Sequence, residues 1–410
     1  YRQQGNLTKA RAMLEFALTG RERLCGENGD AATSSANELA HVFFCKGDMD
    51  KAEELYYRTL HQRIASRGSK SPRTIETMID LATVYNRRHP ELARPLYLQA
   101  LRSCRETLDP KHRISLKAIS SLAAHYVDGG QNDLALPLYL EAYLGYNHRL
   151  GRRHPTSLQH AHDFAVCLMN LQRTAAAEML LVKLQEWCSA ELGEADELTL
   201  AVTHSLGKNA LEYADFRRAE EQFWTAWTGR KQTLGERHVL TIESLYQLVP
   251  VYDRQGKQQQ ALDACVHVLQ ARERSLVLMH PDAVEVMLNL AKRYGEQGQL
   301  IEAERLFRKA QKGCDLNKGP KHKMTINASH MHALILAILG KLGEAETLLR
   351  KCVHLFYEVY GVSHVKSVTV TFHWGLVLGK QGRFDDAIKS LHLARRDFGR
   401  TLGADHHMTL

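Results

Sequence analysis

The chain has 410 residues, a formal net charge of +8 at pH 7 and only 9 prolines. No apolar run approaches the roughly 18 residues that a membrane-spanning helix requires, and no stretch alternates apolar with polar residues as a half-buried strand does. The charge is small for this length, and basic residues alternate with acidic ones along most of the sequence. The composition therefore argues against a membrane span and against direct nucleic-acid binding, and it indicates an all-helical chain.

One unit recurs along the chain and is well formed at residues 289–310, NLAKRYGEQGQLIEAERLFRKA. It reads as two short amphipathic helices joined by a turn. Leu290, Ala291 and Tyr294 recur at helical spacing, and a second apolar stripe follows Gly298. A single hairpin of this kind cannot bury its apolar face, so it is stable only when stacked on its neighbours.

In chain order, the copies are marked by an alanine in the second helix, followed four residues later by a residue that is large and apolar in most copies. The alanines are Ala10, Ala52, Ala93, Ala135, Ala177, Ala219, Ala261, Ala303, Ala345 and Ala387. Every step is 42 residues except the 41-residue step from Ala52 to Ala93. We therefore predict an all-α, right-handed α-solenoid of about nine to ten stacked helix pairs, continuous over residues 1–410.

A turn glycine ends the first helix in most copies, because glycine adopts the left-handed conformation at little steric cost. The glycines are Gly5, Gly47, Gly130, Gly256, Gly298, Gly340 and Gly382. Gln172 and Ala214 replace it in two copies, and residues 86–90 replace it in the copy with the 41-residue step. We expect the pitch of the superhelix to change near these copies.

Both ends of the sequence fall within a repeat. Tyr1 already occupies a tyrosine position of the first helix, and residues 404–410 begin another link between repeats. We therefore expect a chain that is truncated at both ends, a fragment of a longer protein.

The pattern resembles the tetratricopeptide repeat in its long, 42-residue form, known from kinesin light chains. The segments ARPLYLQAL from Ala93 and ALPLYLEAY from Ala135 carry the resemblance closely, as does the link LGRRHPTS at residues 150–157. Pro95 and Pro137 fall near the start of the second helix, where a missing N–H costs least. The resemblance covers the whole chain. It implies a non-enzymatic scaffold that binds a peptide segment or a partner domain in a concave groove.

In this family the first helix of each pair lines the groove. Carrying the groove positions across gives a set of candidate partner-binding residues: Lys117, Ser121, Gln159, His162, His204, Lys208, Glu243, Tyr246, Glu285, Asn289, Lys292 and Asn327. Kinesin light chains place asparagines just before the Leu-Ala of this helix, where amides bind a peptide backbone. Here only Asn37 and Asn289 keep that feature, which implies a different specificity.

Histidine is abundant, with 22 in the chain, and one set recurs at the repeat period with Asp196 in its single gap. The set is His112, His154, His238, His280, His322, His364 and His406. Neighbouring repeats are separated by on the order of 10 Å, whereas zinc holds its ligands near ~2 Å. We therefore predict that these residues cap helices, that no metal or other cofactor is bound, and that the chain is not an enzyme.

The eight cysteines form no C-x-x-C pair. Several fall in apolar helix positions, which favours free thiols packed as small hydrophobic residues in a reducing compartment. We therefore expect a cytoplasmic protein.

A second interpretation comes from another class of protein. Arrays of this long repeat also resemble the sensor ends of STAND-type, NB-ARC-like nucleotide-binding switch proteins, and the chain would then be a C-terminal regulatory domain. A third attaches the array to a protease or kinase. The full-length sequence would separate the three: a P-loop before Tyr1 indicates the switch, a coiled-coil segment the kinesin-type adaptor, and a catalytic signature the enzyme.

Overall fold

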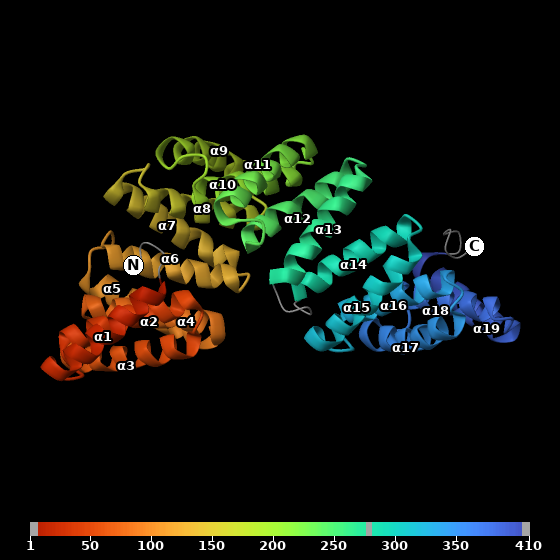
Figure 1. Cartoon of the computed structure of the whole chain (residues 1–410), viewed down its shortest axis with the longest axis horizontal. Helices are drawn as coiled ribbons and strands as arrows, with labels where there is room; N and C mark the ends of the chain where they lie inside the picture. The colour runs from red at the N-terminus through yellow and green to blue at the C-terminus, as the bar shows by residue number, and fades with distance from the viewer. Residues whose placement is uncertain (1–6, 276–280, 404–410) are drawn as a thin grey trace. The chain divides into compact units, whose positions relative to one another are not determined.

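The computed structural model describes residues 7–275 and 281–403, and all secondary structure in them is helical. The predictions made for Tyr1, Gly5, His280 and residues 404–410 lie outside these residues. The chain divides into two compact units, Tyr1–Tyr213 and Ala214–Leu410. Within each unit the helices follow one another in space in chain order (Figure 1). The predicted all-α solenoid of stacked helix pairs is confirmed.

The first unit contains ten helices in its described part. They are α1 (Leu7–Cys25), α2 (Asp30–Lys46), α3 (Met49–Arg67), α4 (Pro72–Arg88), α5 (Pro90–Thr107), α6 (Arg113–Asp128), α7 (Asn132–Leu150), α8 (Pro155–Asn170), α9 (Thr174–Glu191) and α10 (Glu197–Glu212). Even-numbered helices are the first helices of the repeats and odd-numbered helices are the second.

The second unit contains nine helices in its described part. They are α11 (Phe216–Leu234), α12 (Val239–Arg254), α13 (Gln258–Ser275), α14 (Pro281–Glu296), α15 (Leu300–Lys318), α16 (Lys323–Ile338), α17 (Leu342–Tyr360), α18 (Val365–Lys380) and α19 (Phe384–Leu402). By sequence α10 and α11 form one repeat, so the division between the units falls inside it.

The repeated alanine is the tightest point of each repeat. Eight of the ten alanines, from Ala52 to Ala345, have no exposed surface, and Ala10 and Ala387 are also buried. The large residue four positions later is buried in most copies, as at Tyr56 and Phe307. First helices of neighbouring repeats also contact each other, for example α4 with α6 and α8 with α10. The core is therefore a continuous layer within each unit, built from contacts between successive helices.

The histidines at the repeat period cap helices, as predicted. The Nδ1 atoms of His112, His154, His238, His322 and His364 each accept a hydrogen bond from the backbone N–H two residues later, at 3.1–3.3 Å. Asp196 fills the gap in the series in the same way, and its Oδ1 accepts from the N–H of Leu198 at 2.9 Å. Each side chain supplies a partner for a backbone donor that the first helical turn leaves unsatisfied.

The two turns that lack glycine still use the left-handed conformation. Gln172 has φ 58° and Ala214 has φ 56°, close to φ 78° at Gly340 in the same position. The turn conformation is thus set by the stacking of the two helices and not by the residue that occupies it. Ala214 is also where the second unit begins. The predicted change of pitch stays a prediction.

Two prolines occupy positions that differ from expectation. Pro95 and Pro137 lie inside α5 and α7, at the sixth residue of each helix. Only the first four N–H groups of a helix lack an intrahelical partner, so each proline removes a hydrogen bond that another residue would make. The prediction that these prolines stand where a missing N–H costs least was wrong. The shortened repeat is accommodated nearby, where His89 alone separates α4 from α5.

Buried arginines link the second helix of one repeat to the first helix of the next. Arg63 Nη1 donates to the carbonyl of Arg73 at 2.9 Å and to Thr77 Oγ1 at 2.5 Å. Arg230 Nη1 donates in the same way to Ser244 Oγ at 2.8 Å. In both pairs the partners are 14 residues apart, so a hydroxyl on the next helix accepts a hydrogen bond from each buried guanidinium.

The left-handed turn at Gln172 gives a stability test. A non-glycine residue in this conformation destabilises the fold by roughly 1–2 kcal/mol. Glycine avoids that strain, but it loses about 0.5–1 kcal/mol more in backbone entropy on folding. Gln172→Gly is therefore expected to raise the free energy of unfolding by about 0.5–1 kcal/mol, measured as a higher urea midpoint. Gly340→Ala at the equivalent turn should lower the midpoint. A lower midpoint for Gln172→Gly would contradict this account.

The histidine caps give a second test. His322→Ala should lower the free energy of unfolding by about 1 kcal/mol, because the N–H of Met324 loses its acceptor. His322→Asp should restore most of that loss, since Asp196 makes the equivalent bond at α10. His354, an exposed residue within α17, provides the control, and its change to alanine should have little effect on the urea midpoint. Equal losses for the alanine and aspartate variants of His322 would exclude the capping role.

Candidate functional site

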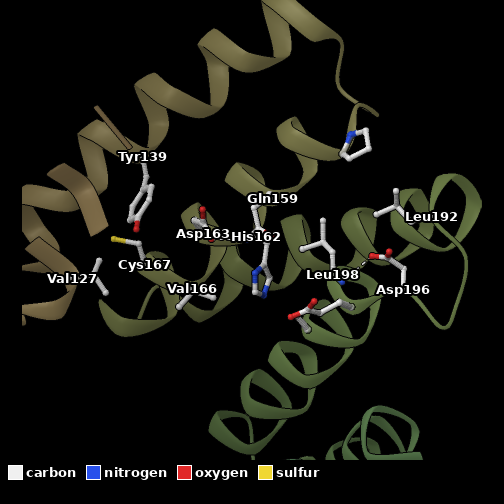
Figure 2. A pocket seen from close by; sticks show the side chains of 13 residues that line it. Val127, Tyr139, Gln159, His162, Asp163, Val166, Cys167, Leu192, Asp196 and Leu198 are labelled. Carbon is white, nitrogen blue, oxygen red and sulfur yellow. Dashed lines mark hydrogen bonds between the residues drawn. The ribbon is translucent and has the colours of Figure 1, made fainter. Parts of the chain in front are cut away.

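A pocket of about 670 Å³ lies in the first unit, on the first helices α6, α8 and α10 (Figure 2). Its lining combines apolar side chains with three carboxylates. The described lining residues are Val127, Tyr139, Pro155, Gln159, His162, Asp163, Val166, Cys167, Leu192, Asp196, Glu197, Leu198 and Ala201. The volume falls within the range of about 300–1,000 Å³ that is typical of ligand sites.

Helix α8 supplies the floor of the pocket. Gln159, His162, Asp163 and Val166 are spaced at helical intervals of three and four residues, so they share one face of the helix. The opposite face carries the apolar residues 158, 161, 165 and 168, which are buried in the core. The same periodicity that packs α8 into the stack therefore presents these side chains to the pocket.

The polar groups lie in the middle of the pocket. In Figure 2, Gln159, His162 and Asp163 lie between Val127 and Tyr139 at one end and Leu192 and Asp196 at the other. A ligand lying along α8 would thus meet apolar surface, then hydrogen-bonding groups, then the start of α10.

All three of these polar side chains make contacts within the chain. Gln159 Nε2 donates to Asp163 Oδ1 at 2.9 Å, and His162 Nε2 lies 2.9 Å from Ser205 Oγ on α10. Asp163 keeps 30% of its side chain exposed, and Glu197 is exposed in the first turn of α10. The two carboxylates can therefore accept further hydrogen bonds from a ligand.

The ionisable side chains at the apolar end of the pocket stay uncharged near neutral pH. Burial, and then the negative charge of Asp163, raise the pKa of Tyr139 above its usual range. Burial also raises the pKa of the Cys167 thiol, whose Sγ donates to the carbonyl of Asn132 at 3.6 Å. Cys167 therefore stays a neutral thiol near pH 7 and is a poor nucleophile.

The pocket contains two of the predicted partner-binding residues, Gln159 and His162. In the same unit Lys117 pairs with Asp80, Ser121 and Lys208 are half-buried, and His204 is buried. In the second unit Lys292 pairs with Glu296 at 3.6 Å, while Glu243 and Asn327 are half-buried. The remaining three, Tyr246, Glu285 and Asn289, form a cluster of their own.

Several first-helix residues join neighbouring repeats directly. His162 contacts Ser205, Asn289 Nδ2 donates to the Tyr246 hydroxyl at 2.6 Å, and His330 Nε2 lies 2.9 Å from His373 Nδ1. In all three pairs the partners are 43 residues apart, one repeat plus one residue. These contacts place groove residues in the interface between repeats, a role that the resemblance did not indicate.

The cluster at Tyr246 is the most developed of these contacts. Its hydroxyl donates to Glu285 Oε1 at 3.4 Å and accepts from Asn289, while the Arg272 guanidinium lies 5.3 Å from the centre of the ring. Burial, and then the charge of Glu285, raise the pKa of Tyr246 to about 12. The side chain thus stays protonated and structural at neutral pH.

The repeat that contains Trp224 and Trp227 forms a separate hollow of about 360 Å³ between α11 and α13. Trp224 and Trp227 lie 4.8 Å apart there. The Lys231 ammonium is 5.1 Å from the Trp227 ring and pairs with Glu236 at 2.5 Å. The ring that would attract a cation therefore already has one from the same chain.

The basic residues in the links at 152–154 and 318–323 are partly neutralised by acidic residues of the chain. Arg153 Nη1 pairs with Glu191 at 3.1 Å, and Lys321 Nζ pairs with Glu358 at 3.1 Å. No group of three His, Cys, Asp or Glu residues in the described ranges is arranged to hold a metal ion. Among the same residues, no helix is long and apolar enough to cross a membrane.

Sequence reasoning missed part of the pocket. The sequence predicts only a capping role for Asp196 and does not place Tyr139 among the candidate binding residues, because each lies outside the groove positions of the first helices. Leu192, Glu197 and Leu198 come from the link before α10 and from its first turn. The signal available in the sequence was Ala201 at the position that Lys117 holds two repeats earlier, and it becomes informative only once the neighbouring side chains are known.

Comparison with known proteins identifies the repeat. Models of the tetratricopeptide repeat match residues 30–106, 1–29 and 284–310. None of the curated proteins compared with the chain matches it. The helix pairs of the described residues agree with these matches to the tetratricopeptide repeat.

Solved structures that are similar to this chain are distant from it in sequence. A STAND protein with a tetratricopeptide repeat sensor from Pyrococcus horikoshii is 13% identical with a TM-score of 0.61, over 85% of this chain and 52% of that one. A Rap protein complexed with competence and sporulation factor is 10% identical with a TM-score of 0.52, over 90% of this chain and 98% of that one. Kinesin light chain TPR-like repeats from Podosopora anserina are 20% identical with a TM-score of 0.44, over 50% and 96%.

The Tyr246 cluster predicts a titration. Because the pKa of an unfolded tyrosine is about 10 and that of Tyr246 is raised to about 12, the stabilisation present below pH 10 is lost as the pH rises toward 12. The ultraviolet titration of the native chain minus that of Tyr246→Phe isolates this residue. Glu285→Gln should lower the pKa of Tyr246, and titration of Tyr246 near pH 10 in the native chain would contradict the assignment.

Proposed function

Because the chain is an array of tetratricopeptide repeats with the 42-residue period of the kinesin light chain-like form, we propose that it is a non-enzymatic interaction scaffold. It binds a segment of a partner protein in the pocket over α8. The observation that carries this proposal is the pocket itself, which brings exposed hydrogen-bonding groups of α8 and α10 together with an apolar end.

The lining suits an extended peptide. The Gln159 amide is exposed and can bond to a peptide backbone, as can the Asp163 carboxylate. Val127, Val166 and Leu198 offer apolar surface to a side chain of the partner. A concave, mostly apolar site with a few well-placed polar groups is the usual form of a binding pocket.

A second candidate function is that of a sensor in a STAND-type, NB-ARC-like nucleotide-binding switch protein. The solved STAND protein with a tetratricopeptide repeat sensor has the same fold over most of this chain. In that case the partner segment bound in the pocket would regulate an ATPase domain. A P-loop before Tyr1 in the full-length protein would support this candidate over a free-standing scaffold.

Two further features belong to the proposal. The repeat step passes from Ala177 to Ala219 and Ala261 without change, which supports one continuous array over both units. All eight cysteines are free, and six of them are buried. Unpaired thiols favour a reducing compartment and therefore a cytoplasmic location.

Filling the pocket tests the proposed function. A displayed library of random peptides is selected on the purified chain, and the enriched sequences are measured by fluorescence anisotropy. Gln159→Trp should weaken their binding at least about tenfold, because the indole occupies the space beside Asp163.

The matched control is Val182→Trp on α9, an exposed residue outside the pocket. It should leave the affinity unchanged. Equal binding by the native chain and the Gln159→Trp variant, with thermal unfolding of both unaltered, would move the binding surface away from α8.

A further inference from the structure

We infer that the pocket over α8 selects a basic segment of a partner protein, one in which an arginine or lysine side chain stands beside an aliphatic one. This inference rests on the proposed function and specifies the chemistry of the partner. The basic side chain would lie between Asp163 and Glu197, and the aliphatic one against Val127 and Val166.

The pocket reverses the charge of the chain. The sequence carries 54 Lys and Arg against 46 Asp and Glu, yet the described lining residues include three carboxylates and no Lys or Arg. In residues 7–275 and 281–403, none of Asp163, Asp196 and Glu197 pairs with a basic residue other than His160, which lies 3.5 Å from Asp163. His160 is itself stacked on Tyr146 at 4.2 Å.

Two acidic residues at inner positions of other first helices, Asp80 and Asp253, are neutralised by a basic residue of the following repeat. In the first unit Lys117 Nζ pairs with Asp80 at 2.6 Å, across the contact between α6 and α4. In the second unit Arg293 pairs with Asp253 at 2.5 Å, from α14 to α12. In the described residues, Asp163 has no lysine or arginine partner of this kind.

The departure has a definite origin in the repeat register. Asp80 and Asp163 hold the same position in their first helices, five residues before Tyr85 and Leu168. Lys117 holds the position nine residues before Tyr126, and its equivalent in the repeat after Asp163 is Ala201. The repeat that follows Asp163 therefore has a methyl group where the internal lysine would stand, and both Asp163 and Ala201 line the pocket.

A partner's basic side chain can take the place of that lysine. A guanidinium provides five donors in a planar fork that matches a carboxylate, and Asp163 Oδ1 accepts only one bond, from Gln159. Glu197 adds a second negative charge from the first turn of α10. The Asp163 side chain is 30% exposed, so an ion pair at this carboxylate is stronger than one between fully exposed groups.

The first experiment compares peptides that differ in one central residue. Fluorescein-labelled peptides with Arg between two leucines and polar ends are titrated against the full chain, beside matched peptides with Gln or Glu in place of Arg. The Arg peptide should bind at least about tenfold more tightly than the Glu peptide, and its affinity should fall as salt is raised.

Ala201→Lys should weaken binding of the Arg peptide about tenfold, because the new ammonium pairs with Asp163 as Lys117 does with Asp80. Ala201→Met adds similar length without charge, so it reports the effect of filling the space alone and should weaken the Arg peptide less than Ala201→Lys does. Thermal unfolding of both variants checks that the repeat stays folded.

The outcomes separate this inference from the proposed function. Tighter binding of the Glu or Gln peptide, or equal effects of Ala201→Lys and Ala201→Met, would overturn the basic specificity and leave a peptide-binding scaffold. If neither the peptide panel nor the displayed library yields a ligand that Gln159→Trp weakens, the proposed function fails and the inference fails with it.

Discussion

The close approach of successive helices at a single small residue is the constraint on which this structure depends. In every complete repeat the second helix has an alanine that is almost or entirely without exposed surface, as at Ala52 and Ala303. A larger side chain there would push the neighbouring helix away, and overpacking of a core costs about 1–3 kcal/mol. Because each repeat buries its apolar face only against the next, that cost would be transmitted to the contacts on both sides.

Once the helices are held this close, the polar residues of the first helices have two possible roles. Some reach the next first helix and bond to it, as His162 does to Ser205 and Asn289 does to Tyr246. Others face solvent, as Glu197 does. The spacing of the repeats allows both roles at the same face. Whether a given side chain stabilises the stack or binds a partner therefore depends on the residue that faces it.

The pocket over α8 illustrates how a hollow can form in a regular array of repeats. Asp80 is neutralised by Lys117 in the following repeat, and the equivalent residue after Asp163 is Ala201. The absence of a lysine at that position leaves space beside Asp163, which has His160 at 3.5 Å as its basic neighbour. The caps at His154 and Asp196 fix the starts of α8 and α10 around it, so the site is held by rigid helices and not by a long loop.

The hydrogen bonds of the buried arginines link neighbouring repeats, and the sequence indicates them when residues 14 positions apart are compared. Arg63 stands 14 residues before Thr77, and Arg230 stands 14 residues before Ser244. A buried guanidinium requires an acceptor, and a hydroxyl at that spacing provides it. The pattern crosses from one repeat to the next, so columns compared one at a time do not reveal it.

The sequence by itself determined the repeat period, the helix pairs, the buried alanines and the histidine caps. These features are local: a cap bonds two residues away, a glycine ends its own helix, and an apolar stripe repeats every three or four residues. It was less reliable for Pro95 and Pro137, because the start of a helix depends on the turn before it. Only the tertiary structure decided which groove residues bond across repeats, and that Asp163, Glu197 and Ala201 share a pocket. Side chains about 40 residues apart meet only when the repeats stack, and the angle of stacking is not encoded in any single repeat.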